Sequence, residues 1–450
     1  MKEKFQKLKK SKRLQNIAKV SSGTLAGQLI NIFSVPFFTR IYGAEILGVW
    51  AFLNAIFLVV NSFSDLGLKQ VIMIGEKTDD EYNQLVYKVI SSIALVISIV
   101  STVIILFFFL LINSSEAGLN LLFLSVYSFL AIFTLQQIQI CNAWINRRAN
   151  YNVLMKNPLI NNFSFAFFGI VLGLLGFVSY GYFIGWLIGQ LITLSHIKKH
   201  SPKGLLTFKI SDFQNVIQKN LVFIKYQLPS NVLIQIKGQI PTFFIQTFFG
   251  IVYLGYFSIT LKMLKVPVNL LGNAVGRIFF QEASDLSSKG KAIGMYTYNN
   301  MKTMMKFSLI PMILFVSLGS NLLVVILGED WRTAGEMFTI ISFQSYFRLL
   351  MMSVSGITAL LQKQHFRMVM SISQIISICL AFTMANFIFD DIFAALIILT
   401  IGEIIINIVF FCKMFIEIDV PYYKYLQDVL INFLIIITAS IVIRYLISSI

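Results

Sequence analysis

The sequence predicts an all-α, polytopic membrane protein. Of its 450 residues, 57% are hydrophobic and only 12% are charged. Apolar stretches of about 20 residues recur along the chain, which is the length that a bilayer core demands of a helix. These stretches are continuous and lack the alternation of lipid-facing strands, so we expect helices rather than a barrel.

We expect thirteen membrane-spanning helices, each a continuous apolar stretch between polar or basic connections. They cover approximately residues 18–39, 46–64, 89–113, 119–140, 158–178, 180–197, 227–249, 253–278, 306–327, 334–360, 368–388, 392–412 and 429–448. The predicted domains are a cytoplasmic basic tail (1–17), an N-terminal six-helix bundle (18–200), a cytoplasmic amphipathic linker (201–226), a C-terminal six-helix bundle (227–413), and a linker with an extra C-terminal helix (414–450).

The basic residues predict the orientation. The first 19 residues carry eight of the 36 lysines and arginines, whereas the connections on the opposite side hold only Arg40 and Arg332. Because lysine and arginine are retained in cytoplasmic loops, we expect the N-terminus in the cytoplasm. Topology and anionic lipid explain the net charge of +16, and no nucleic-acid partner is expected.

An internal repeat supports two bundles. Tyr42-Gly43 recurs 207 residues later as Phe249-Gly250. Near an offset of 213, Gly189-Gln190 recurs as Gly402-Glu403, which puts six helices in each copy. Because an even number of spans separates the copies, both enter the membrane in the same sense.

Two local patterns predict packing. Gly169 with Gly173, and Gly181 with Gly185, have the four-residue spacing of closely packed helices. Residues 213–221, between the bundles, place apolar side chains on one face among lysines. This segment is predicted to form an interfacial amphipathic helix.

Cationic side chains near the middle of apolar spans indicate a functional site. The four are Lys237, Lys262, Lys265 and Arg348. Such a charge costs about 2.5–3.5 kcal/mol at the centre of a spanning helix, so it should face a watery cavity or an anionic ligand rather than lipid. We therefore predict a cationic, substrate-binding cavity.

Amides at helical spacing predict the polar lining of that cavity: Gln28, Asn31, Asn231, Gln235, Asn269 and Asn273. The repeat maps Gln28 onto Gln235. The alternative is that these amides bond helix to helix without any substrate. Glu403, near the membrane centre, and Asp65 are candidates for coupling transport to an ion.

The remaining patterns point away from metal and enzyme chemistry. Cys141, Cys379 and Cys412 lack metal-ligand spacing, so no metal site, cofactor or disulfide is expected. The short outer connections offer no acid–base pair or nucleophile triad, and the chain has no nucleotide-binding loop. A catalytic function is therefore not expected.

Several motifs resemble those of a known family, the Wzx-type polysaccharide flippases. They are Thr39-Arg40-Ile41-Tyr42-Gly43 with Leu47-Gly48, Ser64-Asp65-Leu66-Gly67-Leu68, and Gly255-Tyr256-Phe257 followed by Pro267-Val268 and Gln281-Glu282-Ala283. The resemblance covers essentially the whole chain. The family is part of the multidrug/oligosaccharidyl-lipid/polysaccharide exporter superfamily, which also holds the MATE-type multidrug antiporters and the lipid II flippases.

The resemblance implies two six-helix bundles in a V around a central cavity. It implies a flippase that moves undecaprenyl-diphosphate-linked oligosaccharide repeat units from the cytoplasmic to the outer leaflet of a bacterial cytoplasmic membrane, by alternating access, for surface polysaccharide assembly. A polysaccharide polymerase and a chain-length regulator are the protein partners it suggests. The thirteenth span departs from the commonest count of twelve.

Other functions stay open at this point. A MATE-type or lipid II-type exporter of the same superfamily is one alternative, although the cations would repel a cationic drug. A membrane polysaccharide polymerase or ligase is an alternative from a different class, and a non-transporting membrane scaffold is a third.

Overall fold

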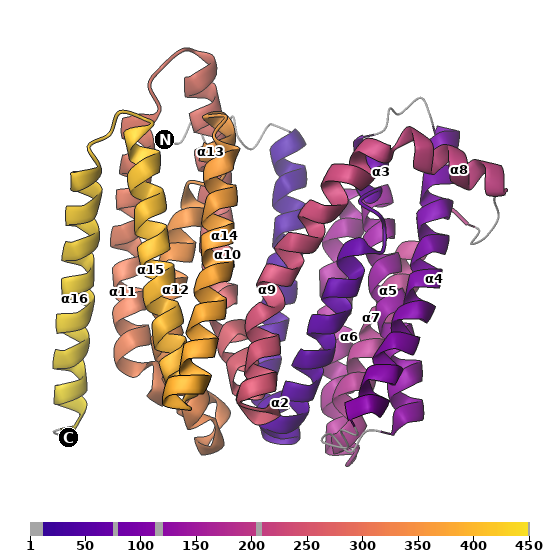
Figure 1. Cartoon of the computed structure of the whole chain (residues 1–450), viewed down its shortest axis with the longest axis horizontal. Helices are drawn as coiled ribbons and strands as arrows, with labels where there is room; N and C mark the ends of the chain where they lie inside the picture. Colours follow the sequence, from indigo (N-terminus) through magenta and orange to yellow (C-terminus); the bar gives the residue numbers. More distant parts are fainter. Residues whose placement is uncertain (1–11, 75–79, 113–119, 204–208, 449–450) are drawn as a thin grey trace. The chain divides into compact units, whose positions relative to one another are not determined.

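The computed structural model describes residues 12–74, 80–112, 120–203 and 209–448, which are almost entirely helical (Figure 1). The chain divides into two compact units, unit 1 (Met1–Gln239) and unit 2 (Ile240–Ile450). Residues 1–11 of the predicted basic tail and residues 204–208 of the predicted linker lie outside the described residues.

Ten helices among the described residues are long and apolar enough to cross a membrane, which confirms the all-α, multi-pass class. One of them, Lys19–Phe63, covers all but one end residue of each of the predicted spans 18–39 and 46–64. The predicted spans 180–197 and 227–249 form the helices α7 (Val178–Lys198) and α9 (Leu228–Phe248), which are not among the ten. Polar residues such as Gln235 and Lys237 lower the hydropathy of α9.

Unit 1 contains the first of two sets of packed helices. Besides α7 it holds α2 (Lys12–Phe63), α3 (Lys69–Ile74), α4 (Asp80–Ile112), α5 (Leu121–Arg147), α6 (Tyr151–Leu174), α8 (Ile210–Lys219) and a π-helical turn, Phe223–Gln227, that leads into α9. Helix α2 packs on α6, α6 on α7, and α4 on α5. Tyr87, Ile90 and Trp144 belong to a buried cluster that joins α3, α4 and α5.

The glycine pairs in α6 and α7 mark close helix packing, as predicted. A Cβ atom added at Gly185 would lie 2.5 Å from the Cα atom of Gly169. Gly173 faces Tyr42 of α2, whose hydroxyl donates a hydrogen bond to the carbonyl oxygen of Gly169. Small residues let helix backbones approach within a membrane, where hydrophobic attraction between helices is absent.

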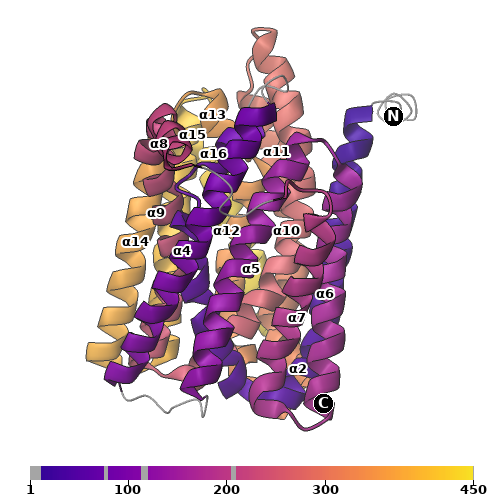
Figure 2. The same cartoon turned by 90° about the vertical axis from the view of Figure 1, so that its right-hand side faces the viewer.

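Helix α8 lies across the end of the unit 1 helices rather than along them (Figures 1 and 2). Its Val216 is fully buried in the cluster that includes Tyr87. Asn220, just after the helix, donates a hydrogen bond of 2.7 Å to the hydroxyl of Tyr82 on α4. The predicted amphipathic helix therefore forms, and its apolar face packs on protein of the same unit.

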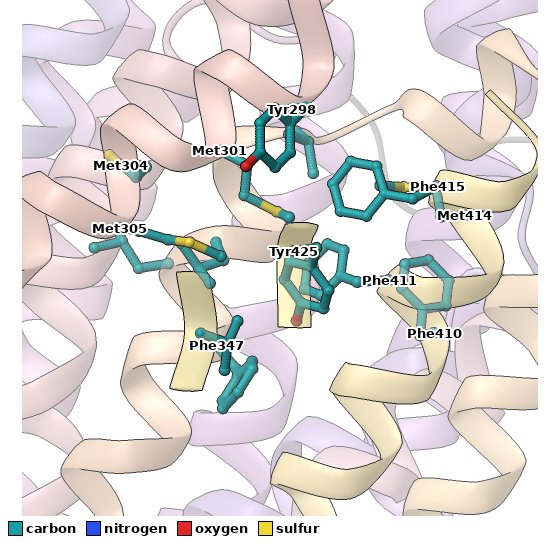
Figure 3. Close-up of a cluster of buried hydrophobic side chains, with 14 of the residues drawn as sticks. Tyr298, Met301, Met304, Met305, Phe347, Phe410, Phe411, Met414, Phe415 and Tyr425 are labelled. Atoms are coloured by element: carbon teal, nitrogen blue, oxygen red, sulfur yellow. The ribbon is translucent and has the colours of Figure 1, made fainter. Parts of the chain in front are cut away.

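Unit 2 contains α10 (Ile251–Ser288), α11 (Gly294–Leu327), α12 (Arg332–Ser353), α13 (Ile357–Leu360), α14 (Gln364–Met384), α15 (Ile392–Ile416) and α16 (Tyr422–Ser448). Helices α10 and α11 pack on α12, and α14 packs on α15. Met301 and Met305 of α11 belong to the same buried cluster as Phe411 and Phe415 of α15 and Tyr425 of α16 (Figure 3).

Polar contacts fix α16, the predicted extra helix, to α11. Asp428 of α16 pairs with Lys302 at 2.9 Å and accepts a hydrogen bond from the hydroxyl of Tyr298. At the other end, the Nη2 atom of Arg444 donates to the carbonyl oxygen of Val316 at 2.6 Å. The helix is therefore held at both ends as well as by apolar packing.

The repeat has a backbone counterpart in two glycines. Gly43, inside α2, has φ 67° and ψ 177°, and Gly250, before α10, has φ 90° and ψ 174°. Only glycine adopts this combination readily. The two positions lie 207 residues apart, as the repeat predicts, and each separates two consecutive membrane helices.

Alanine at Gly43 or at Gly250 should destabilise the protein, because a residue with a Cβ atom is strained in either backbone conformation. We expect a loss of about 1–3 kcal/mol in the free energy of unfolding. The thermal unfolding midpoint in detergent measures it. Gly238→Ala is the control, since Gly238 is helical and a Cβ atom there meets nothing within 4 Å. Equal midpoints for all three variants would contradict the prediction.

Asp428→Ala should loosen α16, because Lys302 and Tyr298 both lose their partner. The free energy of unfolding should fall by about 1–3 kcal/mol, and a protease should cut the connection before α16 faster. Asp285→Ala is the matched control. Both side chains of the ion pair between Asp285 and Lys289 are exposed, so this pair should contribute less than about 1 kcal/mol to the free energy of unfolding. An equal effect of the two variants would exclude the anchoring role.

Candidate functional site: a cationic pair on α10 and α12

The predicted cations of unit 2 gather on one face of a helix. Lys262, Lys265, Asn269 and Asn273 follow one another at three- and four-residue steps along α10, which is continuous through Pro267. Proline has no N–H, so the carbonyl oxygen one turn earlier lacks its usual helical partner. The cations and amides predicted for this span therefore share one helix face, named here the polar stripe of α10.

Arg348 of α12 lies beside this face. Helices α10 and α12 touch where Gly272 and Gly276 meet Met352, since a Cβ atom at Gly272 would lie 2.7 Å from the Cβ of Met352. One helix separates α10 from α12 in the chain, so the two run in the same direction. Arg348, one turn before Met352, is therefore level with residues 268–272 of α10, about one turn beyond Lys265.

Lys265 and Arg348 form a like-charged pair, named here the cationic pair. The contact between α10 and α12 brings the two side chains to within about one helical turn of each other, and two positive charges in that arrangement repel. Both side chains are exposed at the surface of unit 2, and no carboxylate of the described residues forms an ion pair with either of them. Two neighbouring cations without a carboxylate partner, on helices long enough to span a membrane, suit an anion, and the predicted substrate-binding role stays a prediction.

The other predicted lining residues belong to unit 1. Gln28 and Asn31 are half-buried on α2, next to its contact with α6 at Gly23 and Gly27. The buried Oδ1 atom of Asn31 has no hydrogen-bond partner among the described residues.

Helix α9 carries the second part of that lining. The side chain of Asn231 accepts a hydrogen bond of 2.8 Å from Gln227. Gln235 and Lys237, four and six residues after Asn231, are half-buried and point to different faces of the helix. That these side chains share one cavity with the cationic pair stays a prediction.

The two predicted coupling carboxylates have different surroundings. Glu403 of α15 is half-buried and accepts a hydrogen bond of 2.8 Å from the Nε2 atom of Gln374 on α14. Asp65 is 2% exposed in the turn after α2, where it accepts from the N–H of Gly67 and lies 3.3 Å from the ammonium of Lys69. Asp65 thus organises a turn, whereas Glu403 lies between two membrane helices.

One further cation of α10, Arg277, was not predicted as a site residue from the sequence. Arg277 of α10 is exposed one turn after Asn273 and extends the same polar stripe. The four-residue steps from Asn269 to Asn273 to Arg277 were the signal that could have found it. No group of His, Cys, Asp and Glu among the described residues could hold a metal ion.

Comparisons with known proteins agree with this architecture. A family model described as "Polysaccharide biosynthesis protein" matches residues 37–336. A search of curated proteins gives no match.

Two solved structures have the same fold. One is the lipid II flippase MurJ in an inward closed conformation, with 16% identity, a TM-score of 0.69, and coverage of 95% of this chain and 99% of that one. The other is an inward-facing multidrug resistance transporter of the MATE family in the MOP superfamily, with 13% identity, a TM-score of 0.56, and coverage of 89% and 94%. At such identities the likeness establishes the fold alone.

Removing one charge of the cationic pair should stabilise the protein when no anion is bound. Lys265→Met relieves the repulsion by Arg348, so the free energy of unfolding should rise by up to about 1 kcal/mol. The thermal unfolding midpoint in detergent at low salt measures it. Lys424→Met, at an exposed lysine of α16, is the control and should leave the midpoint unchanged. A lower midpoint for Lys265→Met would show that the ammonium makes a stabilising contact.

Proposed function

Because the chain belongs to the polysaccharide biosynthesis protein family, we propose that it is a flippase for polyprenyl-diphosphate-linked oligosaccharides. It is a multi-pass membrane protein with the fold of the MOP exporter superfamily, which is a superfamily of transporters and not of enzymes. The observation that carries the proposal is the cationic pair, Lys265 and Arg348, without a carboxylate partner among the described residues.

The chemistry of the cationic pair suits a lipid diphosphate. A guanidinium group binds phosphate oxygens through two parallel hydrogen bonds, and an ammonium group adds a compact charge. Arg348 and Lys265 come from neighbouring helices, so two phosphates could be held from two sides. Lys262 and Lys237 are further cationic residues of the proposed site.

The amides suit the sugar part of the same substrate. Asn269 and Asn273 continue the α10 face beyond the cations and offer both donors and acceptors to hydroxyl groups. The prenyl tail stays in lipid, because exposing its many methylene groups to water costs about 0.8 kcal/mol each. The head group is therefore the part of the substrate that the protein must carry.

The positive charge of the site also argues against the alternative function, a multidrug exporter of organic cations. A cationic drug would be repelled by Lys265 and Arg348, and specificity against such ligands follows from repulsion as much as from attraction. The same argument does not separate this proposal from an exporter of the lipid II type. The lipid that accumulates in a transport-deficient strain identifies the substrate.

Translocation is proposed to occur by alternating access. The anionic head group neutralises the cations, and the loss of their mutual repulsion favours a closed state around the substrate. The sequence contains no nucleotide-binding motif, so an ion gradient, the membrane potential or the substrate gradient supplies the energy. Glu403 is the candidate for ion coupling between helices, and Asp65 is the second.

The test is the double variant Lys265→Ala with Arg348→Ala, at matched protein level in the membrane. Loss of charge-assisted contacts worth about 1.5–3 kcal/mol each should reduce export at least tenfold. Lipid-linked oligosaccharide should accumulate in the cytoplasmic leaflet, measured by its accessibility to a membrane-impermeant label.

Two control variants complete this test. Lys265→Arg with Arg348→Lys keeps both charges and should retain much of the export. Lys291→Ala with Lys424→Ala removes two exposed cations elsewhere and should have no effect. Normal export by the Lys265→Ala, Arg348→Ala protein would rule out the cationic pair as the head-group site.

A further inference from the structure

A groove runs between α14 and α15 on unit 2, apart from the cationic pair. It has a volume of about 460 Å³ and a mostly apolar lining, which includes Phe366, Val369 and Met370 of α14 and Ile406, Val409 and Phe410 of α15. Val369 is 55% exposed and Val409 is 48% exposed, so the groove opens to the outside of the unit. Its lining on each helix spans nine residues, which corresponds to a length of about 12 Å.

The two basic side chains that line this groove lie at the same end of it. Helices α14 and α15 are consecutive and antiparallel, so His365, at the start of α14, and Lys413, in the last turn of α15, share one end. Both side chains are exposed. This is the end that the sequence predicts to be cytoplasmic.

The ammonium of Lys413 is available to an external anion. The carboxylate that follows it by one helical turn, Glu417, pairs at 3.0 Å with Lys363 from the start of α14. Among the described residues, no ion pair or side-chain hydrogen bond involves Lys413. The nearby acid is thus already neutralised, and the groove ends in a net positive charge.

We infer that this groove binds an anionic membrane phospholipid, with its phosphate at Lys413 and His365 and one acyl chain along the apolar lining. An apolar groove in a membrane gains little from an acyl chain that leaves equally apolar lipid. A preference for one lipid over another must therefore come from its head group. A lysine near the membrane surface attracts anionic lipid. The site is independent of the proposed transport function, since none of its residues belongs to the cationic pair or the polar lining.

Photo-crosslinking of the full chain tests this inference. A benzophenone amino acid replaces Val369 in the groove, and the protein is reconstituted in vesicles of equal parts phosphatidylglycerol and phosphatidylcholine. Mass spectrometry identifies the lipid that becomes attached. We expect phosphatidylglycerol to be favoured about fivefold, the attraction of one lysine for anionic lipid. The same probe at Val325, an exposed residue of α11 with no lysine or arginine within six positions in the sequence, should show no such preference.

Variants that change a charge test whether the preference for phosphatidylglycerol comes from the groove. Lys413→Glu should abolish the enrichment at position 369, whereas Lys424→Glu, the same charge change on exposed α16, should preserve it. Equal labelling of the two lipids in the unsubstituted background, or an equal effect of the two variants, would overturn the inference. So would a crosslink from position 369 to a protein segment. Thermal midpoints check that each variant is folded.

Discussion

The absence of hydrogen-bond partners in the hydrocarbon core of a membrane is the constraint on which this structure depends. Every backbone N–H and C=O within lipid must be paired inside the protein, so each crossing segment is helical. Between crossings the chain must turn within a few residues, and Gly43 and Gly250 do so in a conformation that only glycine adopts readily. Close helix contacts then depend on small side chains such as Gly169 and Gly185, because lipid supplies no hydrophobic drive to association.

The same constraint makes a charge within a spanning helix informative. Lipid would reject an ammonium or guanidinium group, so Lys265 and Arg348 remain in the chain only at a cost in stability. A ligand of opposite charge offsets that cost when it binds. Sites that favour a ligand commonly weaken the empty protein in this way. The repulsion within the cationic pair and its affinity for an anion are therefore two consequences of one arrangement.

The cations of unit 2 differ in their position along a helix, and this difference suits them to different ligands. Lys265 and Arg348 lie within long apolar helices, whereas Lys413 lies in the last turn of α15 with Glu417 and Lys363 close by. A cation at a helix end reaches the head-group region without crossing lipid. The first location suits a substrate that must pass through the membrane, and the second suits a lipid that stays in its leaflet.

The sequence by itself determined the class of fold, most helices, the repeat and the identity of the cations, because hydropathy, helical spacing and charge are properties of the local chain. It also predicted the packing glycines. It did not reveal that Arg348 lies near Lys265, that Gln374 binds Glu403, that α8 packs on its own unit, or that α14 and α15 leave a groove. Only the tertiary structure decided these, because residues far apart in the chain become neighbours through the packing of whole helices, and no local pattern specifies which faces meet.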